Sequence, residues 1–519
     1  MSHVVADQSE IFDFLADPGT HGGPVRRIDT HGAVVFLAGE NAWKVKRAVR
    51  FPFMDFSTLA KRKAACAAEV AINRPNAPDL YRGVVPIVRD GDGLRLGGAG
   101  EPVEWAVHMR RFDESRTLDR VATDGLGRDL LARLAAAVIA SHERAPVRDG
   151  AAATDALARY VEENREAFAE TPDLFPPDRA AALTRAAGDA LSALRPLLLA
   201  RGEAGFVRRC HGDLHLRNIV LLDGEPVLFD AIEFDDAIAT GDVLYDLAFL
   251  LMDLWERDLR AEANLLLNRY LWGTDEAHLQ GLAALPLFLS LRAAIRAKVT
   301  AAALPHLTGE ARGKAAAEAR RYFAFAETFL APAPAFLLTV GGLSGTGKST
   351  LAAALTPRLG RPPGAVHLRS DVERKRLFGV PETERLPADA YDPAVTREVY
   401  ARLQRQATLA VSAGSAVVVD AVHARPDERA AIEAVARDAG CAFAGLWLEA
   451  PAAVLTKRVE ARRGDASDAG AAVVAQQVGY DVGPVGWRRL DASIGTEALT
   501  GAALAALGES GIAVGEEGT

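Results

Sequence analysis

The pattern of apolar and polar positions divides the chain into three stretches. Up to about residue 110, short apolar runs alternate with Gly and Asp turns, which predicts one helix at 57–74 and strands at 33–39, 41–49, 83–88, 94–98 and 104–112. From about 117 to 331 the apolar residues recur at helical spacing, with one strand-like block at 210–236. These two stretches predict an α+β, bilobal domain at 1–330, with lobes at about 1–110 and 111–330.

The third stretch follows the segment APAPA at Ala331–Ala335, where two prolines in five residues cannot continue a helix. Apolar strands are predicted at 336–340, 415–420 and 441–449, and they alternate with helical runs at 349–359, 394–411 and 426–440. This alternation is typical of an α/β domain with a parallel sheet. We therefore predict a second domain at 336–519.

Composition and charge exclude several classes of protein. Of 519 residues, 49% are hydrophobic and 25% are charged, which is typical of a globular chain and not of a disordered one. The formal charge of −9 argues against coating nucleic acid or anionic membrane, so no membrane partner is expected and a nucleic-acid partner is disfavoured. Three scattered cysteines form neither a disulfide framework nor a metal motif, and the N-terminus does not resemble a secretory signal, which predicts a cytoplasmic protein.

A phosphate-binding motif opens the third stretch. The segment GLSGTGKS at Gly342–Ser349 matches G-x-x-x-x-G-K-[ST], and it lies between a predicted strand and a predicted helix, as that motif requires. Its backbone N–H groups would surround phosphate oxygens, while Lys348 reaches the outer phosphates and Ser349 offers a hydroxyl to Mg²⁺. The predicted nucleotide-binding residues are Gly342, Leu343, Ser344, Gly345, Thr346, Gly347, Lys348, Ser349 and Thr350.

Three further segments of this stretch carry candidate chemistry. Asp420 ends an apolar strand, where an acid can hold the metal or simply form a turn. Asp371 and Arg374 lie one helical turn apart, so the acid could accept a hydroxyl proton while the arginine binds an anionic group; an exposed ion pair is the alternative.

Arg458 and Arg462 are spaced i, i+4 before a Gly/Asp/Ser loop. Such a loop could close over a transferred phosphoryl group, although an arginine-rich helix is also typical of a solvated surface. With the phosphate-binding motif, these residues resemble the small-molecule kinases of the P-loop fold, in particular gluconate kinase-like kinases and, more distantly, polynucleotide kinases and zeta toxins. The resemblance spans about 336–495, and it implies catalytic roles for Lys348, Asp371, Arg374, Arg458 and Arg462.

A second phosphotransferase pattern lies in the strand-like block at 210–236. The segment HGDLHLRN at His211–Asn218, followed by FDAIEFD, has the spacing H-x-D-x-x-x-x-N…D of a kinase catalytic loop and its metal-binding acid. In that chemistry Asp213 orients and deprotonates the acceptor hydroxyl, while Asn218 and Asp230 bind metal. We expect His211 to brace the loop by hydrogen bonds.

This block resembles the aminoglycoside phosphotransferase family, whose fold is like that of protein kinases, over about 28–329. The resemblance implies that Asp246 anchors the catalytic loop. Lys44 fits the strand lysine that binds the α- and β-phosphates, and Glu69 fits its ion-pair partner on a helix. Lys46 points to the same strand face and remains a competing candidate. The glycine-rich loop of protein kinases is absent.

Together the patterns predict a two-headed kinase that uses Mg²⁺ and ATP, or another nucleoside triphosphate, to phosphorylate hydroxyls of small molecules. Sugars, amino sugars, aminoglycosides and other metabolites remain open as acceptors, and an aminoglycoside would need an acidic cleft, with which Asp235, Asp236 and Asp253 are compatible. One alternative is that one head catalyses while the other only senses nucleotide. Another is a 5′-hydroxyl polynucleotide kinase in the C-terminal half, which the overall acidity disfavours.

Overall fold

The computed structural model describes residues 3–51, 54–91, 93–462 and 464–512. By packing, the chain divides into two compact units, one made of residues 1–159 and 198–253 and the other of residues 160–197 and 254–519. Helices α6 (Gly150–Glu170), α7 (Pro177–Glu203) and α9 (Val243–Glu256) have residues in both units. Within the described ranges, no helix has the length and apolarity needed to cross a membrane.

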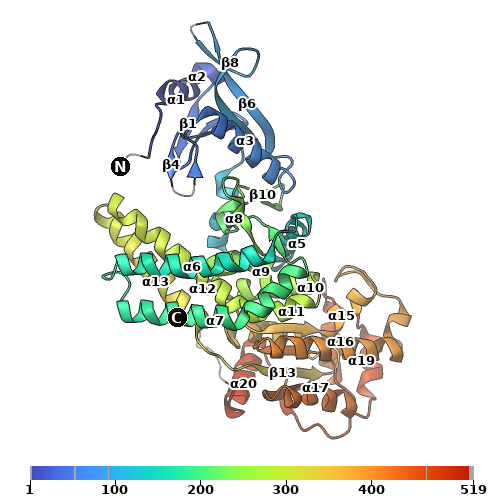
Figure 1. The fold of residues 1–519 in the computed structure, drawn as a ribbon. Helices are drawn as coiled ribbons and strands as arrows, with labels where there is room; N and C mark the ends of the chain where they lie inside the picture. Colours follow the sequence, from blue (N-terminus) through green and yellow to red (C-terminus); the bar gives the residue numbers. More distant parts are fainter. Residues whose placement is uncertain (1–2, 52–53, 92, 463, 513–519) are drawn as a thin grey trace. The chain divides into compact units, whose positions relative to one another are not determined.

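The first unit contains a six-stranded antiparallel sheet with the order β1-β2-β3-β8-β6-β7 (Figure 1). Its strands are β1 (Val25–Asp29), β2 (Ala33–Ala38), β3 (Asn41–Lys46), β6 (Tyr81–Asp90), β7 (Gly93–Leu96) and β8 (Glu101–Arg110). One helix was predicted here, and it is α3 (Leu59–Asn73), which begins after the capping side chain of Thr58. A second helix, α1 (Ser9–Ala16), precedes the sheet. Neither α1 nor the short α2 (Pro18–His21) was predicted.

The two faces of this sheet are covered by different helices. Val70 of α3 packs with Leu37 and Ala42 on one face, whereas Ile11 of α1 packs with Phe36 on the other. Because side chains alternate along a strand, Lys44 and Lys46 of β3 lie on the same face as Ala42, toward α3. The strand period therefore directs both candidate lysines at the helix that carries Glu69.

The rest of the first unit is helical with short hairpins, as the sequence predicts. Strands β10 (Ile219–Leu222) and β11 (Glu225–Leu228) pair within the predicted strand-like block, and β9 (Val207–Arg209) pairs with β12 (Thr240–Asp242). The remaining elements are β4 (Arg50–Phe51), β5 (Met54–Asp55), η1 (Glu114–Arg116), α4 (Leu118–Val121), η2 (Ala122–Asp124), α5 (Arg128–Arg144), η3 (Leu216–Asn218) and α8 (Asp236–Ala239).

The second unit contains a five-stranded parallel sheet with the order β14-β15-β13-β16-β17, which confirms the predicted α/β architecture. Its strands are β13 (Phe336–Gly342), β14 (Val366–Arg369), β15 (Val417–Asp420), β16 (Ala442–Glu449) and β17 (Arg488–Asp491). Strand β17 has the sequence RRLD and a mostly exposed pattern. It was not predicted, because no apolar run marks it.

Helices cover both faces of the parallel sheet (Figure 1). α14 (Lys348–Leu355) and α20 (Thr496–Glu509) share an apolar core with one face, and α16 (Pro393–Ser412) and α17 (Pro426–Asp438) pack on the other. At one end of the sheet, η6 (Thr356–Arg358) follows α14 and precedes β14. Further elements at the opposite end, where the carboxyl ends of the strands lie, are α15 (Ser370–Leu377), α18 (Ala452–Ala461), α19 (Ala471–Val478) and η7 (Ala388–Tyr391). In open α/β sheets this end is where ligands bind.

The second unit also includes helices that precede the Ala331–Ala335 segment. They are α10 (Arg260–Gly273), α11 (Ala277–Gly281), η4 (Leu282–Ala284), α12 (Leu285–Ala303), η5 (Leu304–His306) and α13 (Gly309–Leu330). Packing thus groups these helices with the parallel sheet. The domain limits of 1–330 and 336–519 stay a prediction.

Gly445 in β16 lies directly under a tryptophan. A Cβ atom at this position would lie 2.3 Å from Cγ of Trp487, and the Trp487 indole is held by a 2.7 Å hydrogen bond from its Nε1 to Oε1 of Glu433. We expect Gly445→Ala to lower the free energy of unfolding by about 1–3 kcal/mol, the usual cost of overpacking. The measurement is chemical or thermal unfolding of the full chain.

Gly501→Ala is the matched control, because Gly501 lies inside α20 and a Cβ there meets nothing within 4 Å. Alanine is the better helix former, so this change should stabilise the protein by up to about 1 kcal/mol. Equal effects of the two substitutions would contradict the packing described for β16.

Candidate active sites

The first candidate site begins with an ion-pair cluster between β3 and α3. Nζ of Lys44 lies 2.8 Å from Oε1 of Glu69 and 2.6 Å from Oδ1 of Asp230. Glu69 is fully buried on α3, and Asp230 follows β11. The structure therefore brings three of the predicted residues together, two from the sheet and helix of the N-terminal lobe and one from the segment after the catalytic loop.

Lys46 belongs to the same cluster. Its Nζ lies 2.5 Å from the other carboxylate oxygen of Glu69, and it also pairs with Glu233. One buried carboxylate thus lies between two ammonium groups. Of the two lysines, Lys44 is the one with an ion pair to Asp230.

The charges of this cluster stabilise one another. Burial alone would lower the pKa of Lys44, but the attraction of Asp230 and Glu69 outweighs it and the pKa lies well above its ordinary value. Burial would raise the pKa values of Glu69 and Asp230, yet the lysines keep both below their ordinary values. All three groups are therefore ionised at neutral pH.

The backbone at Asp230 is held in an unusual conformation. Asp230 has φ +60, its N–H donates to the Tyr81 hydroxyl at 3.1 Å, and the N–H of Ala231 donates to Oδ1 of Asn73 at 2.8 Å. Asn73 also donates to the backbone oxygen of Glu69 at 3.0 Å. A non-glycine residue with positive φ persists only where its surroundings hold it, and here Tyr81 and Asn73 do so. Sequence analysis missed both residues, because their partners are distant in the chain.

The predicted catalytic loop places Asp213 next to Asn218. Nδ2 of Asn218 donates to the backbone oxygen and to Oδ2 of Asp213, both at 3.0 Å, and Nε2 of His215 lies 3.3 Å from the same Oδ2. The Asp213 side chain is 38% exposed, so a substrate can reach it. Because the amide nitrogen of Asn218 is directed at Asp213, its Oδ1 is the atom left to bind a cation.

Two expectations about the support of this loop are confirmed. Nε2 of His211 lies 2.9 Å from the backbone oxygen of Phe229, and burial lowers the His211 pKa, so a neutral imidazole donates this bond. Oδ1 of Asp246 accepts from the N–H of Gly212 at 2.8 Å. His211 and Asp246 therefore shape the loop.

The three acids considered for a cationic acceptor all have partners within the fold. Asp253 is buried and accepts from the N–H of Leu216 at 2.9 Å. Asp235 caps α8, and Asp236 pairs with Arg209 at 2.9 Å. The Asp236 side chain is nevertheless 70% exposed, so an acidic acceptor cleft stays a prediction.

The residues of the first site fit a magnesium-bound nucleotide. Asp230 offers a carboxylate whose side chain is 41% exposed, Asn218 offers an amide oxygen, and Lys44 supplies a positive charge beside them. Oxygen ligands of this kind suit Mg²⁺, and a lysine suits phosphate.

The second candidate site is formed by the loop between β13 and α14. Gly345 has φ +87, and a Cβ there would lie 2.7 Å from the backbone oxygen of Leu455. Gly347, with φ +90, caps the N-terminus of α14, where a Cβ would meet nothing within 4 Å. Both glycines therefore adopt the positive-φ backbone that a phosphate-binding loop at a helix N-terminus requires.

Lys348 points back over this loop. Its Nζ donates to the backbone oxygen of Leu343 at 3.2 Å. Among the described residues, no carboxylate lies close enough to Nζ to form an ion pair. Burial lowers the Lys348 pKa, although Asp420 and Asp371 act in the opposite direction. A partly buried cation without a direct counter-ion among the described residues fits a site that receives phosphate oxygens.

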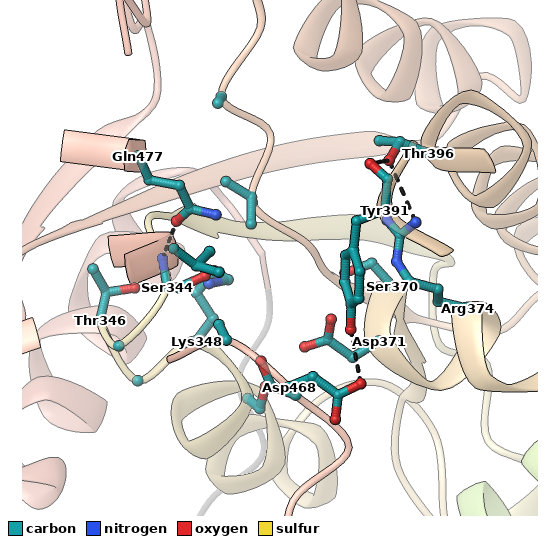
Figure 2. Close-up of a pocket in the computed structure, with 18 of the residues that line it drawn as sticks. Ser344, Thr346, Lys348, Ser370, Asp371, Arg374, Tyr391, Thr396, Asp468 and Gln477 are labelled. Atoms are coloured by element: carbon teal, nitrogen blue, oxygen red, sulfur yellow. Dashed lines mark hydrogen bonds between the residues drawn. The ribbon is translucent and has the colours of Figure 1, made fainter. Parts of the chain in front are cut away.

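A glutamine from α19 reaches the same loop. The N–H of Ser344 donates to Oε1 of Gln477 at 2.7 Å, as Figure 2 shows. Gln477 was not among the predicted residues, because no motif in the sequence of α19 indicates a binding role for it. Its side chain accepts the hydrogen bond of the Ser344 N–H, a group that the motif is expected to direct at phosphate.

Asp420 lies at the end of β15, as predicted, and it is 4% exposed. Burial opposes ionisation, but hydrogen bonding from His367 and the charges of Arg369 and Lys348 hold the pKa of Asp420 well below its ordinary range. The carboxylate is thus ionised, and with the Ser349 hydroxyl it could hold Mg²⁺ in the manner of P-loop enzymes. Both residue types fit that ion.

Asp371 and Arg374 both lie on α15 and line the pocket of this site. Nη1 of Arg374 donates to the backbone oxygen of Ala390 at 2.6 Å and lies 3.3 Å from Oγ1 of Thr396, and its guanidinium packs over Tyr391 (Figure 2). Arg374 therefore supports the segment that borders the pocket, and the alternative of an exposed ion pair with Asp371 does not form.

Arg458 and Arg462 also line the pocket, but they do not share a helix face. α18 ends at Ala461, so Arg462 lies in extended conformation just after the helix, while Nη1 of Arg458 approaches the Thr346 backbone oxygen at 3.5 Å. The loop that follows is tied down through Asp468. Its carboxylate accepts from Lys375 at 2.8 Å and from the Tyr391 hydroxyl at 2.9 Å.

These residues surround one large open pocket of about 1730 Å³. The pocket is lined by the phosphate-binding loop, by Asp371, by Arg458 and Arg462 in and just after α18, and by the glutamines at the end of α19. The arrangement can bind a nucleotide at one end and place a hydroxyl compound beside Asp371 at the other.

Two family models match the chain. Residues 53–282 match the model described as "Phosphotransferase enzyme family", and residues 337–480 match the model described as "AAA domain". Uncharacterized proteins of Mycobacterium tuberculosis and Mycobacterium bovis are 31% identical over 468 residues, which is 88% of this chain and 90% of theirs.

Solved structures resemble each part. A gluconokinase from Sinorhizobium meliloti is 22% identical, with a TM-score of 0.25, and covers 34% of this chain and 93% of its own. A choline/ethanolamine kinase family protein from Mesorhizobium loti is 15% identical, with a TM-score of 0.38, and covers 61% of this chain and 98% of its own.

The protein is an enzyme of the kinase class, a phosphotransferase that joins a kinase-like region to a P-loop kinase region. This confirms the two resemblances drawn from the motifs. The chain belongs to the same family as the mycobacterial proteins, with which it shares nearly its whole length.

Gln477 competes with phosphate for the N–H of Ser344, so its removal should strengthen nucleotide binding. One hydrogen bond is worth about 1 kcal/mol, and we expect Gln477→Ala to tighten ATP binding by about fivefold. The measurement is titration of a non-hydrolysable ATP analogue, counting only the binding that Lys348→Ala removes. Gln476→Ala is the control, since Gln476 is the exposed neighbour on α19. Weaker binding by Gln477→Ala would mean that the amide contacts the nucleotide instead.

Proposed function

We propose that both regions are active and that the protein is a two-headed phosphotransferase. Each head transfers the γ-phosphoryl group of ATP, or of a similar nucleoside triphosphate, to a hydroxyl of a small molecule. The observation that carries this proposal is that both sites combine a partly buried lysine, an acid placed where it could hold metal, and a separate carboxylate that faces the pocket or is open to solvent. A site that only sensed nucleotide would not need the third group.

In the first head, Asp213 accepts the proton of the acceptor hydroxyl. The acceptor oxygen then forms a bond to the γ-phosphorus while the bond from that phosphorus to the bridging oxygen breaks. Lys44, held by Glu69, binds the α- and β-phosphates, and Lys46 completes the charge balance around Glu69. Asn218 and Asp230 would hold Mg²⁺, which supplies charge neutralisation when bound.

In the second head, the backbone from Gly342 to Thr350 surrounds the phosphates and Lys348 reaches the outer ones. Ser349 and Asp420 would hold Mg²⁺, and Asp371 accepts the acceptor proton. Arg458 and Arg462 stabilise the transferred charge, and Arg374 shapes the acceptor side through the segment at Ala390.

The acceptors are hydroxyl compounds such as sugars, amino sugars or aminoglycosides. Because the reaction consumes nucleoside triphosphate, we place the protein in the cytoplasm.

The test is a radiolabel transfer screen over sugars, aminoglycosides and oligonucleotides with each head disabled in turn. Lys348→Ala should abolish transfer by the second head and leave the first active. Asp213→Asn should cut transfer by the first head at least about 10²-fold with nearly unchanged nucleotide affinity, because it keeps the oxygen that Asn218 contacts and removes the base.

Lys457→Ala is the control for Lys348→Ala, since Lys457 is exposed on α18. Transfer that survives both disabling changes together would contradict the assignment of the two sites. Label on oligonucleotides alone would point to a polynucleotide kinase in the C-terminal half.

Asp371 provides a separate prediction. Asp371→Asn should reduce phosphoryl transfer by the second head at least about 10²-fold and spare Mg²⁺-ATP binding, because the phosphate and metal contacts come from other residues. Binding and transfer are measured on the same preparations. Asp427→Asn is the control, because Asp427 lines the same pocket but is paired with Arg425. A parallel loss of ATP binding would give Asp371 a nucleotide-binding role.

A further inference from the structure

Helix α10 covers the open edge of the parallel sheet. Strand β14 is at one end of the sheet order, so its outer backbone groups have no neighbouring strand. The N–H of His367 donates to Oδ1 of Asn268 at 2.7 Å, and Nε1 of Trp272 donates to the backbone oxygen of His367 at 2.7 Å. Asn264 and Asn268 donate to the backbone oxygen of Ala365 at 3.0 and 3.2 Å.

These three side chains lie on one helix face, since Asn264, Asn268 and Trp272 are spaced i, i+4 and i+8. Both asparagines are 2% exposed. Side chains of α10 thus take the place of a sixth strand. Buried amide groups are stable only when paired, so this contact holds β14 in one position relative to the helix.

Strand β14 ends in Arg369, which is 5% exposed and surrounded by carboxylates. Its Nη2 donates to Asp465 at 2.8 Å, its Nη1 donates to Glu382 at 3.1 Å, and its Nε lies 3.5 Å from Oδ2 of Asp420. Arg369 and Asp420 are also opposite each other in the ladder of β14 and β15. One guanidinium therefore connects the proposed metal-binding acid to the loop after Arg462.

Helix α10 reaches this guanidinium as well. Nη1 of Arg269 donates to the same Glu382 carboxylate, and the Trp272 ring centroid lies 4.9 Å from Cζ of Arg269 and 5.8 Å from Cζ of Arg369. The order of contacts is Arg269, Glu382, Arg369, and then Asp420 and Asp465. A buried charge needs its partners in good geometry, so a change at Arg269 affects where the Arg369 guanidinium settles.

We propose that α10 is part of the second active site, with Arg369 as a positioning residue and Arg269 and Trp272 as its supports. The inference rests on the proposed function of the P-loop head. It adds that this head is incomplete without a helix from the region that matches the phosphotransferase family model, residues 53–282. Fusion of the two kinases is then a requirement of the second site, because α10 orients the acid that binds its metal.

The test uses the full chain carrying Asp213→Asn, so that ATP hydrolysis reports the second head. In this background Arg269→Gln should lower the hydrolysis rate by about tenfold and raise the Mg²⁺ concentration needed for half-maximal rate. The reason is that Glu382, without its partner Arg269, no longer fixes the position of the Arg369 guanidinium beside Asp420. Arg269→Lys should restore most of the rate, since it returns the charge at Glu382. Trp272→Phe should show a smaller loss of the same kind.

Arg260→Gln is the matched control, because Arg260 lies on the same helix but contacts other residues, through an ion pair at 3.5 Å with the exposed Asp258 and a cation–π contact with Trp255. If Arg269→Gln behaves like this control, the inference is overturned while the proposed function stands. A lowered unfolding temperature with no rescue by Arg269→Lys would make α10 a purely structural support and also overturn it. If the background shows no ATP hydrolysis that depends on Lys348, the proposed function fails and the inference falls with it.

Discussion

Glu69 lies fully buried between the ammonium groups of Lys44 and Lys46, and the geometry of the first site depends on this one carboxylate. A buried charge is stable only when an opposite charge lies against it. α3 must therefore pack on β3 in the position that brings Glu69 between both lysines. Asn73 on the same helix then accepts from the N–H of Ala231 and so holds the backbone beside Asp230. The position of Asp230, the acid that we propose binds metal, follows from the position of a helix in the N-terminal lobe.

In the second site the buried charge is a cation, and it too is paired with opposite charges. Arg369 is a buried cation among Asp420, Asp465 and Glu382, and its strand is held at the edge of the sheet by side chains of α10. Lys348, by contrast, has no carboxylate of the described residues within ion-pair distance and approaches a backbone oxygen instead. The cation that supports the site is neutralised by the protein, whereas the cation that we propose to bind phosphate is left for its substrate.

Local motifs predicted the chemistry better than they predicted the support. Asp213, Asn218 and Lys348 lie where their motifs require, since each motif spans a single turn or hairpin. Tyr81, Asn73, Gln477 and Asn268 were missed, because each acts on a backbone group far away in the chain and has no characteristic spacing. The sequence also could not show that Asp235 caps α8, that Asp236 pairs with Arg209 and that Asp253 accepts from Leu216, because these partners are set by the fold.

The amino-acid sequence by itself determined that the chain carries two kinase-type regions, an α+β one and a parallel α/β one. Periodicity and the two motifs, for phosphate binding and for the catalytic loop, are local properties of the chain. Short-range backbone sterics and hydrogen bonding determine the local structure that each of them predicts. Only the tertiary structure decided that both lysines share Glu69 and that α18 ends before Arg462, so that Arg458 and Arg462 do not share a helix face. It also decided that α10 completes the edge of β14. Those contacts join residues dozens to a hundred positions apart, and burial, which makes them strong, exists only once the chain has folded.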